Sequence, residues 1–288
     1  MKTAKNARFA ILTDTTLCTG CEECVKACKE INHLGKDRSR RWNGAIDDLS
    51  ATRFTTIVRQ RGGLFVRRQC RHCQSPACVS ACIVGALQKT DEGPVIYDDK
   101  KCIGCRYCML ACPYGIPRYE WDEAIPYVRK CTFCYDKIMS GELDRPACVA
   151  ACPQNATIFG TRDDMIREAK NRIAASPGKY WQDRVIGETE VGGTSVLYIS
   201  DRPLDFLAWK ADIGDRPLPE LTAASLKMVP PTILVVGGVM AAVWWVIGRR
   251  MEMQAHSQHA VDHVGEAPAA GSASDLESEQ SDGREIQQ

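Results

Sequence analysis

The stretch Cys102-Ile103-Gly104-Cys105-Arg106-Tyr107-Cys108-Met109-Leu110-Ala111-Cys112-Pro113 decides how this chain folds. Its spacing, C-x2-C-x2-C-x3-C-P, is that of a bacterial-type ligand run for a [4Fe-4S] cluster, in which three thiolates bind one cubane and the fourth reaches a neighbouring one. A fourth cysteine that reaches away implies that clusters occur in pairs. The stretch therefore predicts at least one further run of four cysteines in the chain.

Three more runs are present, and together with this stretch they use every cysteine in the chain. In chain order, the runs are Cys18, Cys21, Cys24 and Cys28; Cys70, Cys73, Cys78 and Cys82; Cys102, Cys105, Cys108 and Cys112; and Cys131, Cys134, Cys148 and Cys152. The 16 cysteines thus form four complete sets, with none left over. We predict that all of them are iron ligands and that the cofactors are four [4Fe-4S] clusters.

Zinc is the nearest alternative, because C-x2-C pairs also build tetrahedral zinc sites. A zinc site normally takes one pair from each of two separated knuckles, whereas these cysteines recur three and then four positions apart, and Pro113 and Pro153 follow two of the runs. A disulfide framework is disfavoured as well, since scaffolds of this cysteine density belong to small chains rather than to one of 288 residues. His72, inside the second run, is expected to donate a hydrogen bond rather than to bind iron.

The charge balance argues against a nucleic-acid-binding protein, because the formal net charge is only +1. Four clusters carrying about −2 each would make the domain distinctly acidic, so cations are expected near the ligands. Basic residues do flank the runs: Lys26, Lys29, Arg67, Arg68, Arg71, Lys100, Lys101, Arg106, Arg129 and Lys130.

Short strands and hairpins are expected between the runs. Residues 54–60 and 64–68 alternate around Gly62 and Gly63, and residues 86–89 and 95–98 flank a second turn. Single strands are expected at residues 8–13, 156–159 and 195–199, and Thr161 is expected to cap a helix that ends before Pro177. The predicted fold class is therefore α+β.

The C-terminal part of the chain has a different character. Residues 228–248 contain no charge, and at about 1.5 Å per residue they are long enough to cross a hydrocarbon core of about 30 Å as one transmembrane helix. Residues 1–200 are expected to form the cluster domain, 201–227 an extended linker, and 249–288 a disordered polar tail.

No catalytic constellation is found in the sequence. There is no nucleophile with a base beside it and no glycine-rich phosphate loop, and every thiol is committed to a ligand set. We therefore predict a non-catalytic electron carrier rather than an enzyme. An iron-sulfur sensor or regulatory protein is the alternative, and it would need a labile, incompletely ligated cluster.

Several phrases carry a family resemblance. Four runs in this order, the decapeptide at 105–114, Ile158-Phe159-Gly160-Thr161-Arg162, Val191-Gly192-Gly193-Thr194 and one C-terminal apolar stretch resemble the iron-sulfur (beta) subunits of membrane-bound formate dehydrogenases and hydrogenase-2-type complexes. The resemblance covers residues 8–250. It departs at Lys29 and Ile83, where ferredoxin runs commonly have proline.

The resemblance implies both partners and a pairing of the runs. A catalytic molybdenum, tungsten or nickel-iron subunit would exchange electrons with the clusters, and an integral membrane subunit with haem b or a quinone site would sit at the other end. Two nested, pseudo-symmetric two-cluster ferredoxin-like units are implied, with these ligand sets: Cys18, Cys21, Cys24 with Cys152; Cys28 with Cys131, Cys134, Cys148; Cys70, Cys73, Cys78 with Cys112; and Cys82 with Cys102, Cys105, Cys108. Spacing alone leaves open a rival in which neighbouring runs pair, first with second and third with fourth.

The orientation in the membrane follows from charge and from the resemblance. Arg249 and Arg250 follow the apolar stretch directly and only Lys227 directly precedes it, which favours a cytoplasmic tail. Over wider flanks this bias nearly vanishes, because Lys210 and Arg216 also precede the stretch, and the family resemblance then decides the orientation. Members of the family face the periplasm and are exported folded beside a partner that carries the export signal, which agrees with the missing signal peptide here. The expectation is a single-pass protein of the inner membrane with a periplasmic cluster domain.

Overall fold

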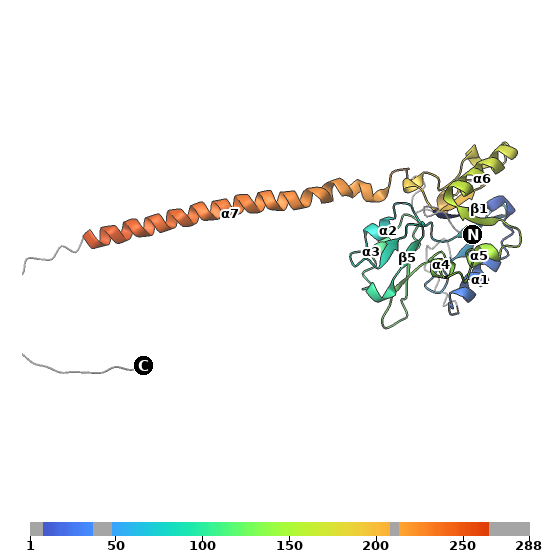
Figure 1. Cartoon of the computed structure of the whole chain (residues 1–288), viewed down its shortest axis with the longest axis horizontal. Coiled ribbons are helices and arrows are strands. Elements are labelled where there is room, and N and C mark those ends of the chain that lie inside the picture. Colours follow the sequence, from blue (N-terminus) through green and yellow to red (C-terminus); the bar gives the residue numbers. More distant parts are fainter. Residues whose placement is uncertain (1–7, 37–47, 208–212, 265–288) are drawn as a thin grey trace, which may run out of the picture. The chain divides into compact units, whose positions relative to one another are not determined.

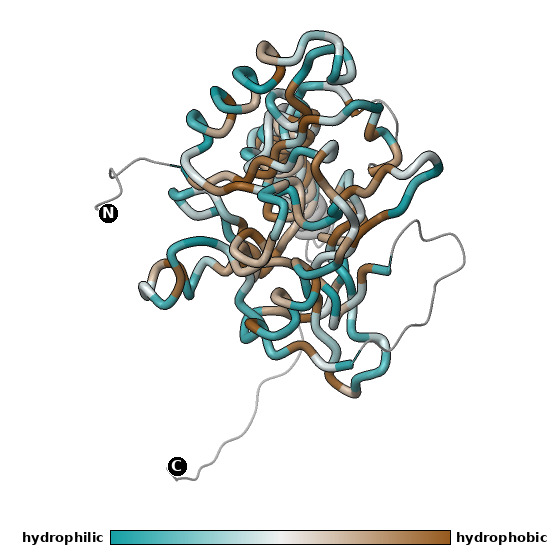
Figure 2. The backbone as a smooth tube through the Cα atoms, turned by 90° about the vertical axis from the view of Figure 1, so that its right-hand side faces the viewer, coloured by the Kyte–Doolittle hydropathy of each residue, from teal (hydrophilic) through white to brown (hydrophobic). Residues whose placement is uncertain are grey.

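The computed structural model describes residues 8–36, 48–207 and 213–264 (Figure 1). The chain divides into two units, Met1–Ala224 and Ser225–Gln288. Unit 1 mixes short strands and helices, as the α+β prediction requires. In Figure 2 hydrophobic and hydrophilic stretches alternate along this unit, which is typical of short elements with one buried side.

A three-stranded sheet forms the base of unit 1. Its strand order is β8-β1-β9, with β1 (Phe9–Asp14) antiparallel to β8 (Thr157–Thr161) and parallel to β9 (Val196–Ile199). Every residue of β1 is buried, because the cysteine-bearing part covers one face and α6 (Arg162–Ala175) the other. The hydroxyl of Thr161 accepts a hydrogen bond from the backbone N–H of Asp164, which confirms the predicted helix cap.

Three hairpins lie between the cysteine runs. The two predicted ones are β2 (Thr56–Gln60) with β3 (Leu64–Arg68), and β4 (Leu87–Lys89) with β5 (Val95–Tyr97). The third, β6 (Arg118–Tyr119) with β7 (Val128–Arg129), was not predicted, because each strand has only two residues and shows no alternation.

Five short helices lie within the cysteine runs, and none of them was predicted. They are α1 (Glu23–Ile31), α2 (Ala77–Ser80), α3 (Tyr107–Ala111), α4 (Tyr135–Met139) and α5 (Ala147–Ala150). Short 3-10 helices occupy Thr15–Leu17, Asp99–Lys101, Trp181–Asp183, Glu190–Gly192 and Asp205–Leu207. Helix α1 packs against α5, and α2 packs against α3, so the first run meets the fourth and the second meets the third (Figure 1).

The expected linker differs from the structure at its beginning. Leu204 and Leu207 are buried in the same core as Phe9 and Val66, so the chain around them belongs to the packed unit rather than to an extended connection. The cause is local composition, because Leu204, Phe206 and Leu207 form an apolar group within an otherwise polar segment. Residues 208–212 lie outside the described residues.

Helix α7 (Leu218–Val264) is longer than the predicted span at both ends. Residues 249–264 are helical rather than disordered, because they contain no glycine or proline to end the helix. The predicted tail beyond Val264 lies outside the described residues. Within the described part of the chain, this is the one helix long and apolar enough to cross a membrane.

Candidate iron-sulfur centres

The structure places thiols from different runs near one another, and their neighbours suggest four candidate sites. We name them site A (Cys18, Cys21, Cys24, Cys152), site B (Cys28, Cys131, Cys134, Cys148), site C (Cys70, Cys73, Cys78, Cys112) and site D (Cys82, Cys102, Cys105, Cys108). In every site three cysteines come from one run and the fourth from its partner run. These neighbours agree with the sets that the family resemblance implied, and the ligand sets and the pairing of the runs stay predictions.

Burial and crowding act on the thiols in each site. At site A, burial raises the pKa of Cys18, and the nearby thiols of Cys152 and Cys21 raise it further. At site D, burial and then Cys105, Cys82 and Cys102 raise the pKa of Cys108 to about 11.

Site C shows the same pattern. Burial raises the pKa of Cys73 well above its usual value, and the neighbouring Cys112, Cys70 and Cys78 raise it further. Four buried thiols therefore ionise together only with a positive group at their centre, which iron supplies.

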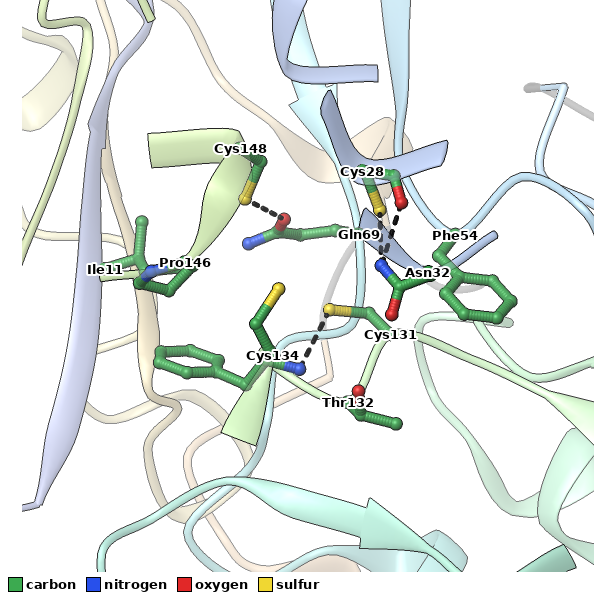
Figure 3. A pocket seen from close by; sticks show the side chains of 11 residues that line it. Ile11, Cys28, Asn32, Phe54, Gln69, Cys131, Thr132, Cys134, Pro146 and Cys148 are labelled. Atoms are coloured by element: carbon green, nitrogen blue, oxygen red, sulfur yellow. Dashed lines mark hydrogen bonds between the residues drawn. The ribbon is translucent and has the colours of Figure 1, made fainter. Parts of the chain in front are cut away.

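Site B lies at a cavity. Its four cysteines line one cavity together with apolar side chains that include Ile11 and Pro146 (Figure 3). Figure 3 shows the four Sγ atoms turned toward the same space, and the side chain of Gln69 reaches into that space. The Sγ of Cys148 lies 4.0 Å from Oε1 of Gln69, and the Nδ2 of Asn32 donates to the Sγ of Cys28 at 3.7 Å.

The short helices explain how one run serves two sites. Cys24 and Cys28 both lie on α1, about one helical turn apart, and their side chains point to site A and site B respectively. In the other three runs the third cysteine lies on α2, α3 or α5, and the fourth follows one or two residues after the helix ends. The spacing of four residues therefore places the fourth cysteine about one helical turn from the third, so that it contributes to the site of the partner run.

The loops before these helices share one backbone feature. The residue before the second cysteine is left-handed in all four runs: Gly20 (φ 72°), His72 (φ 49°), Gly104 (φ 70°) and Phe133 (φ 68°). A left-handed residue curls the loop so that backbone N–H groups point at sulfur, as in anion-binding nests. The N–H of Phe133 accordingly donates to the Sγ of Cys131 at 3.3 Å.

The sequence indicates this left-handed residue in only two of the four runs. Glycine at positions 20 and 104 indicates a left-handed residue, whereas His72 and Phe133 pay a conformational cost for it. Burial holds them in place, since both side chains are at most 1 % exposed and their rings pack edge to face with centroids 4.9 Å apart. The Nδ1 of His72 also accepts a hydrogen bond of 2.9 Å from the N–H of Val95, so its Nε2 carries the proton.

The structure separates the flanking cations into two kinds. Lys26 and Arg106 are exposed, whereas Arg67, Arg68, Arg71 and Lys130 are buried among the cysteine loops. Burial opposes the charge of Arg67, but the nearby sulfurs of Cys148 and Cys24 outweigh it and raise the pKa of the guanidinium. Conversely, burial raises the pKa of Cys24 to about 12 against the opposing pull of Arg67.

The four sites are connected in a single series. Cys24 of site A lies near Cys148 of site B, and Cys131 of site B lies near Cys70 of site C. Cys78 of site C in turn lies near Cys108 of site D. Sites A and D therefore form the two ends of the series.

The donor sets suit a multi-iron cluster better than a single ion. Among the described residues, no three His, Cys, Asp or Glu side chains come close enough to hold one metal ion, although all 16 cysteines are described. A cubane separates its four thiolates more widely than one ion does. Buried N–H donors also lack a protein acceptor within the described part of the chain, at Arg67 Nε and Nη1, Gln69 Nε2 and His72 Nε2, and cluster sulfur would accept from such groups.

Comparison with known proteins agrees with this geometry. Residues 62–162 match the 4Fe-4S dicluster domain family, so the fold and its thiol groups define an iron-sulfur protein with a ferredoxin-like domain. The chain is 36 % identical to a protein of Nitratidesulfovibrio vulgaris (strain Hildenborough) over 280 residues, which cover 92 % of this chain and 73 % of the relative.

Two further relatives have informative names. The hydrogenase-2 operon protein HybA of Escherichia coli O157:H7 is 34 % identical over 237 residues, 69 % of this chain and 72 % of that protein. The iron-sulfur subunit of the nitrate-inducible formate dehydrogenase of Escherichia coli K12 is 36 % identical over 212 residues, 68 % of this chain and 70 % of that protein. The chain belongs to the family of iron-sulfur subunits of respiratory oxidoreductases.

Proposed function

We propose that the chain is a non-catalytic electron-transfer subunit that binds four [4Fe-4S] clusters through its 16 cysteines, one cluster at each of sites A to D. Each cluster supplies one-electron chemistry, and the protein supplies spacing, burial and charge. The observation that carries this proposal is the grouping of all the cysteines into four complete sets of thiols. Complete ligation also argues against a sensor with a labile cluster.

The proposed architecture is two nested ferredoxin-like units. Sites A and B form one unit from the first and fourth runs, and sites C and D form the other from the second and third. The packing of α1 on α5 and of α2 on α3 supports this arrangement, because each helix pair joins the two runs of one unit.

We propose that electrons follow the series from site A through B and C to site D, or the reverse. Neighbouring thiols across each boundary, such as Cys131 beside Cys70, support short steps between adjacent sites. A series has two ends, so two redox partners are required: a catalytic subunit of the molybdenum, tungsten or nickel-iron type, and an integral membrane subunit with haem b or a quinone site.

The surface at site D supports a permanently bound partner. Six large apolar side chains around its loops are between 53 % and 77 % exposed: Ile83, Ile103, Tyr107, Leu110, Trp121 and Ile125. We call this group the site D patch. Contiguous exposed apolar side chains on a soluble unit mark interaction surfaces. The surface at site A is instead polar, with ion pairs Glu22–Arg59 and Glu23–Lys26.

We assign the site D patch to the membrane partner. Ile213 and Leu218, at the C-terminal end of unit 1, belong to the same hydrophobic cluster as Cys70, Cys73 and Cys112 of site C and Cys131 of site B. Site D is next to site C in the series, so it is the end nearer to this exit. The catalytic partner then meets the polar surface at site A.

Helix α7 is the proposed single membrane anchor, with residues 228–248 crossing the hydrocarbon core of the inner membrane. Its apolar character and the family membership support this role. We propose that the cluster domain faces the periplasm and that residues 249–288 face the cytoplasm, as the positions of Arg249 and Arg250 favour.

The test is metal analysis of the purified full chain together with one ligand variant. The wild type is expected to hold about 16 iron and 16 acid-labile sulfide per chain, as four ligand sets require. Cys112→Ser is expected to perturb the cluster with Cys70, Cys73 and Cys78, and to leave the cluster with Cys102, Cys105 and Cys108 intact. Stoichiometric zinc with little iron, or loss confined to the second of these clusters, would reject the proposal.

A further inference from the structure

The buried guanidinium of Arg67 lies between site A and site B. Its side chain is 2 % exposed although it comes from the end of the β2–β3 hairpin. The cysteines that it affects electrostatically belong to both sites, since Cys18 and Cys24 are in site A, and Cys28, Cys131 and Cys148 are in site B. One fixed positive charge is therefore shared by two proposed clusters.

The polypeptide provides hydrogen-bond partners for only one of the three nitrogens of this guanidinium among the described residues. Nη2 donates to the hydroxyl of Thr157 at 2.9 Å and lies 3.5 Å from the hydroxyl of Thr13, two residues paired across β8 and β1. Among the described residues, neither Nε nor Nη1 has an acceptor. A buried charged donor without a partner is costly, so these two groups require an acceptor that the polypeptide does not provide.

We infer that Arg67 is a positioning residue for electron transfer between sites A and B, which donates Nε–H and Nη1–H toward cluster sulfur and favours the reduced form of both clusters. Reduction adds one electron and one negative charge to a cluster and makes or breaks no bond, and a nearby cation favours this change. When the electron passes from site A to site B, site A is reoxidised as site B is reduced. Arginine keeps its proton throughout, so no proton transfer accompanies the step.

A cation placed between two sites affects them together. It therefore favours both reduced forms without favouring one direction of transfer, which suits a step that can run either way along the series. Two lysines act in a different way, since Lys89 and Lys130 donate to the backbone carbonyls of Cys73 in site C and Cys131 in site B. The inference rests on the proposed function, because it requires clusters at sites A and B.

The first test is a redox titration of the full chain in its purified complex, followed by electron paramagnetic resonance and with the iron content measured in parallel. Arg67→Gln removes the charge. At a fixed potential, the ratio of oxidised to reduced form is expected to rise at least tenfold in two of the four clusters, which equals about 59 mV for one electron. Arg67→Lys keeps the charge, so the ratio of oxidised to reduced form is expected to stay within about threefold of the wild-type ratio. The matched control is Arg59→Gln on the same hairpin, where an exposed guanidinium pairs with Glu22 at 3.2 Å beside site A, and a change below about twofold is expected because solvent screens this charge.

The second test needs no neutral variant and covers the case in which Arg67→Gln does not assemble. The wild type is labelled with 15N-arginine, and pulsed electron paramagnetic resonance is expected to detect 15N coupling on two reduced clusters, which Arg67→Lys removes. Unchanged potentials in an Arg67→Gln protein with full iron content would overturn the inference, and so would absent 15N coupling. Low iron in the wild type would instead overturn the proposed function itself.

Discussion

Replacing Gly20 by alanine should favour local opening of the chain at site A, and Gly63 provides a matched control. Gly20 precedes Cys21 with φ +72°, and an added Cβ would lie 2.5 Å from Cδ1 of Phe65. Gly63, in the nearby β2–β3 turn, has almost the same conformation, with φ +78°, but an added Cβ would meet nothing within 4 Å. The two substitutions therefore share the backbone strain and differ in the contact with Phe65.

The expected magnitudes follow from these two terms. A left-handed alanine costs about 1–2 kcal/mol at either position. Forcing a methyl group against a ring in a packed region adds about 1–3 kcal/mol, at Gly20 alone. The local opening equilibrium should thus differ between the variants by roughly 5- to 150-fold.

The assay is the loss of iron-sulfur absorbance from the full chain in the presence of an iron chelator, which reports local opening. Gly20→Ala is expected to lose about a quarter of its absorbance in a fast phase, because one site of four is affected, while Gly63→Ala bleaches like the wild type. Adding Phe65→Leu to Gly20→Ala should slow the fast phase again, since it relieves the contact. Equal bleaching of the two glycine variants would refute the argument.

Three other predictions address the partners and the membrane. Leu110→Asp is expected to keep the iron content of the wild type and a free energy of unfolding within about 0.5 kcal/mol of it, because Leu110 is 77 % exposed. The membrane subunit is expected no longer to copurify with this variant. The control is Met139→Asp, at a side chain that is 52 % exposed and lies outside the site D patch. Retained copurification of the Leu110 variant would contradict the assignment of the patch. Truncation after Leu226 is expected to yield a soluble chain with full iron content that no longer couples its catalytic partner to quinone, and undiminished quinone reduction would show α7 to be dispensable. Protease added to intact spheroplasts is expected to digest residues 1–226 and spare the tail, whereas protection of the cluster domain would indicate a cytoplasmic location.

Much of the fold was predictable from local sequence. The two hairpins around Gly62 and Asp91, strand β1 and the cap at Thr161 depend on residues close together in the chain, so their patterns are complete within a short window. The helices α2 to α5 were missed because four or five residues cannot show helical periodicity. Helix α1 has nine residues, but cysteines hold two of its buried positions, Cys24 and Cys28. The tail up to Val264 was misjudged because polarity was taken for disorder, although its residues favour a helix.

The sequence by itself determined that all 16 cysteines fall into four runs, because spacing is a property of the chain alone. Only the tertiary structure decided which runs lie side by side, since the packing of α1 on α5 brings Cys28 near Cys148. The same holds for Arg67, which in the sequence is one of many flanking cations and in the fold is buried between two sites. Burial and contact depend on residues far apart in the chain, and no local pattern encodes them.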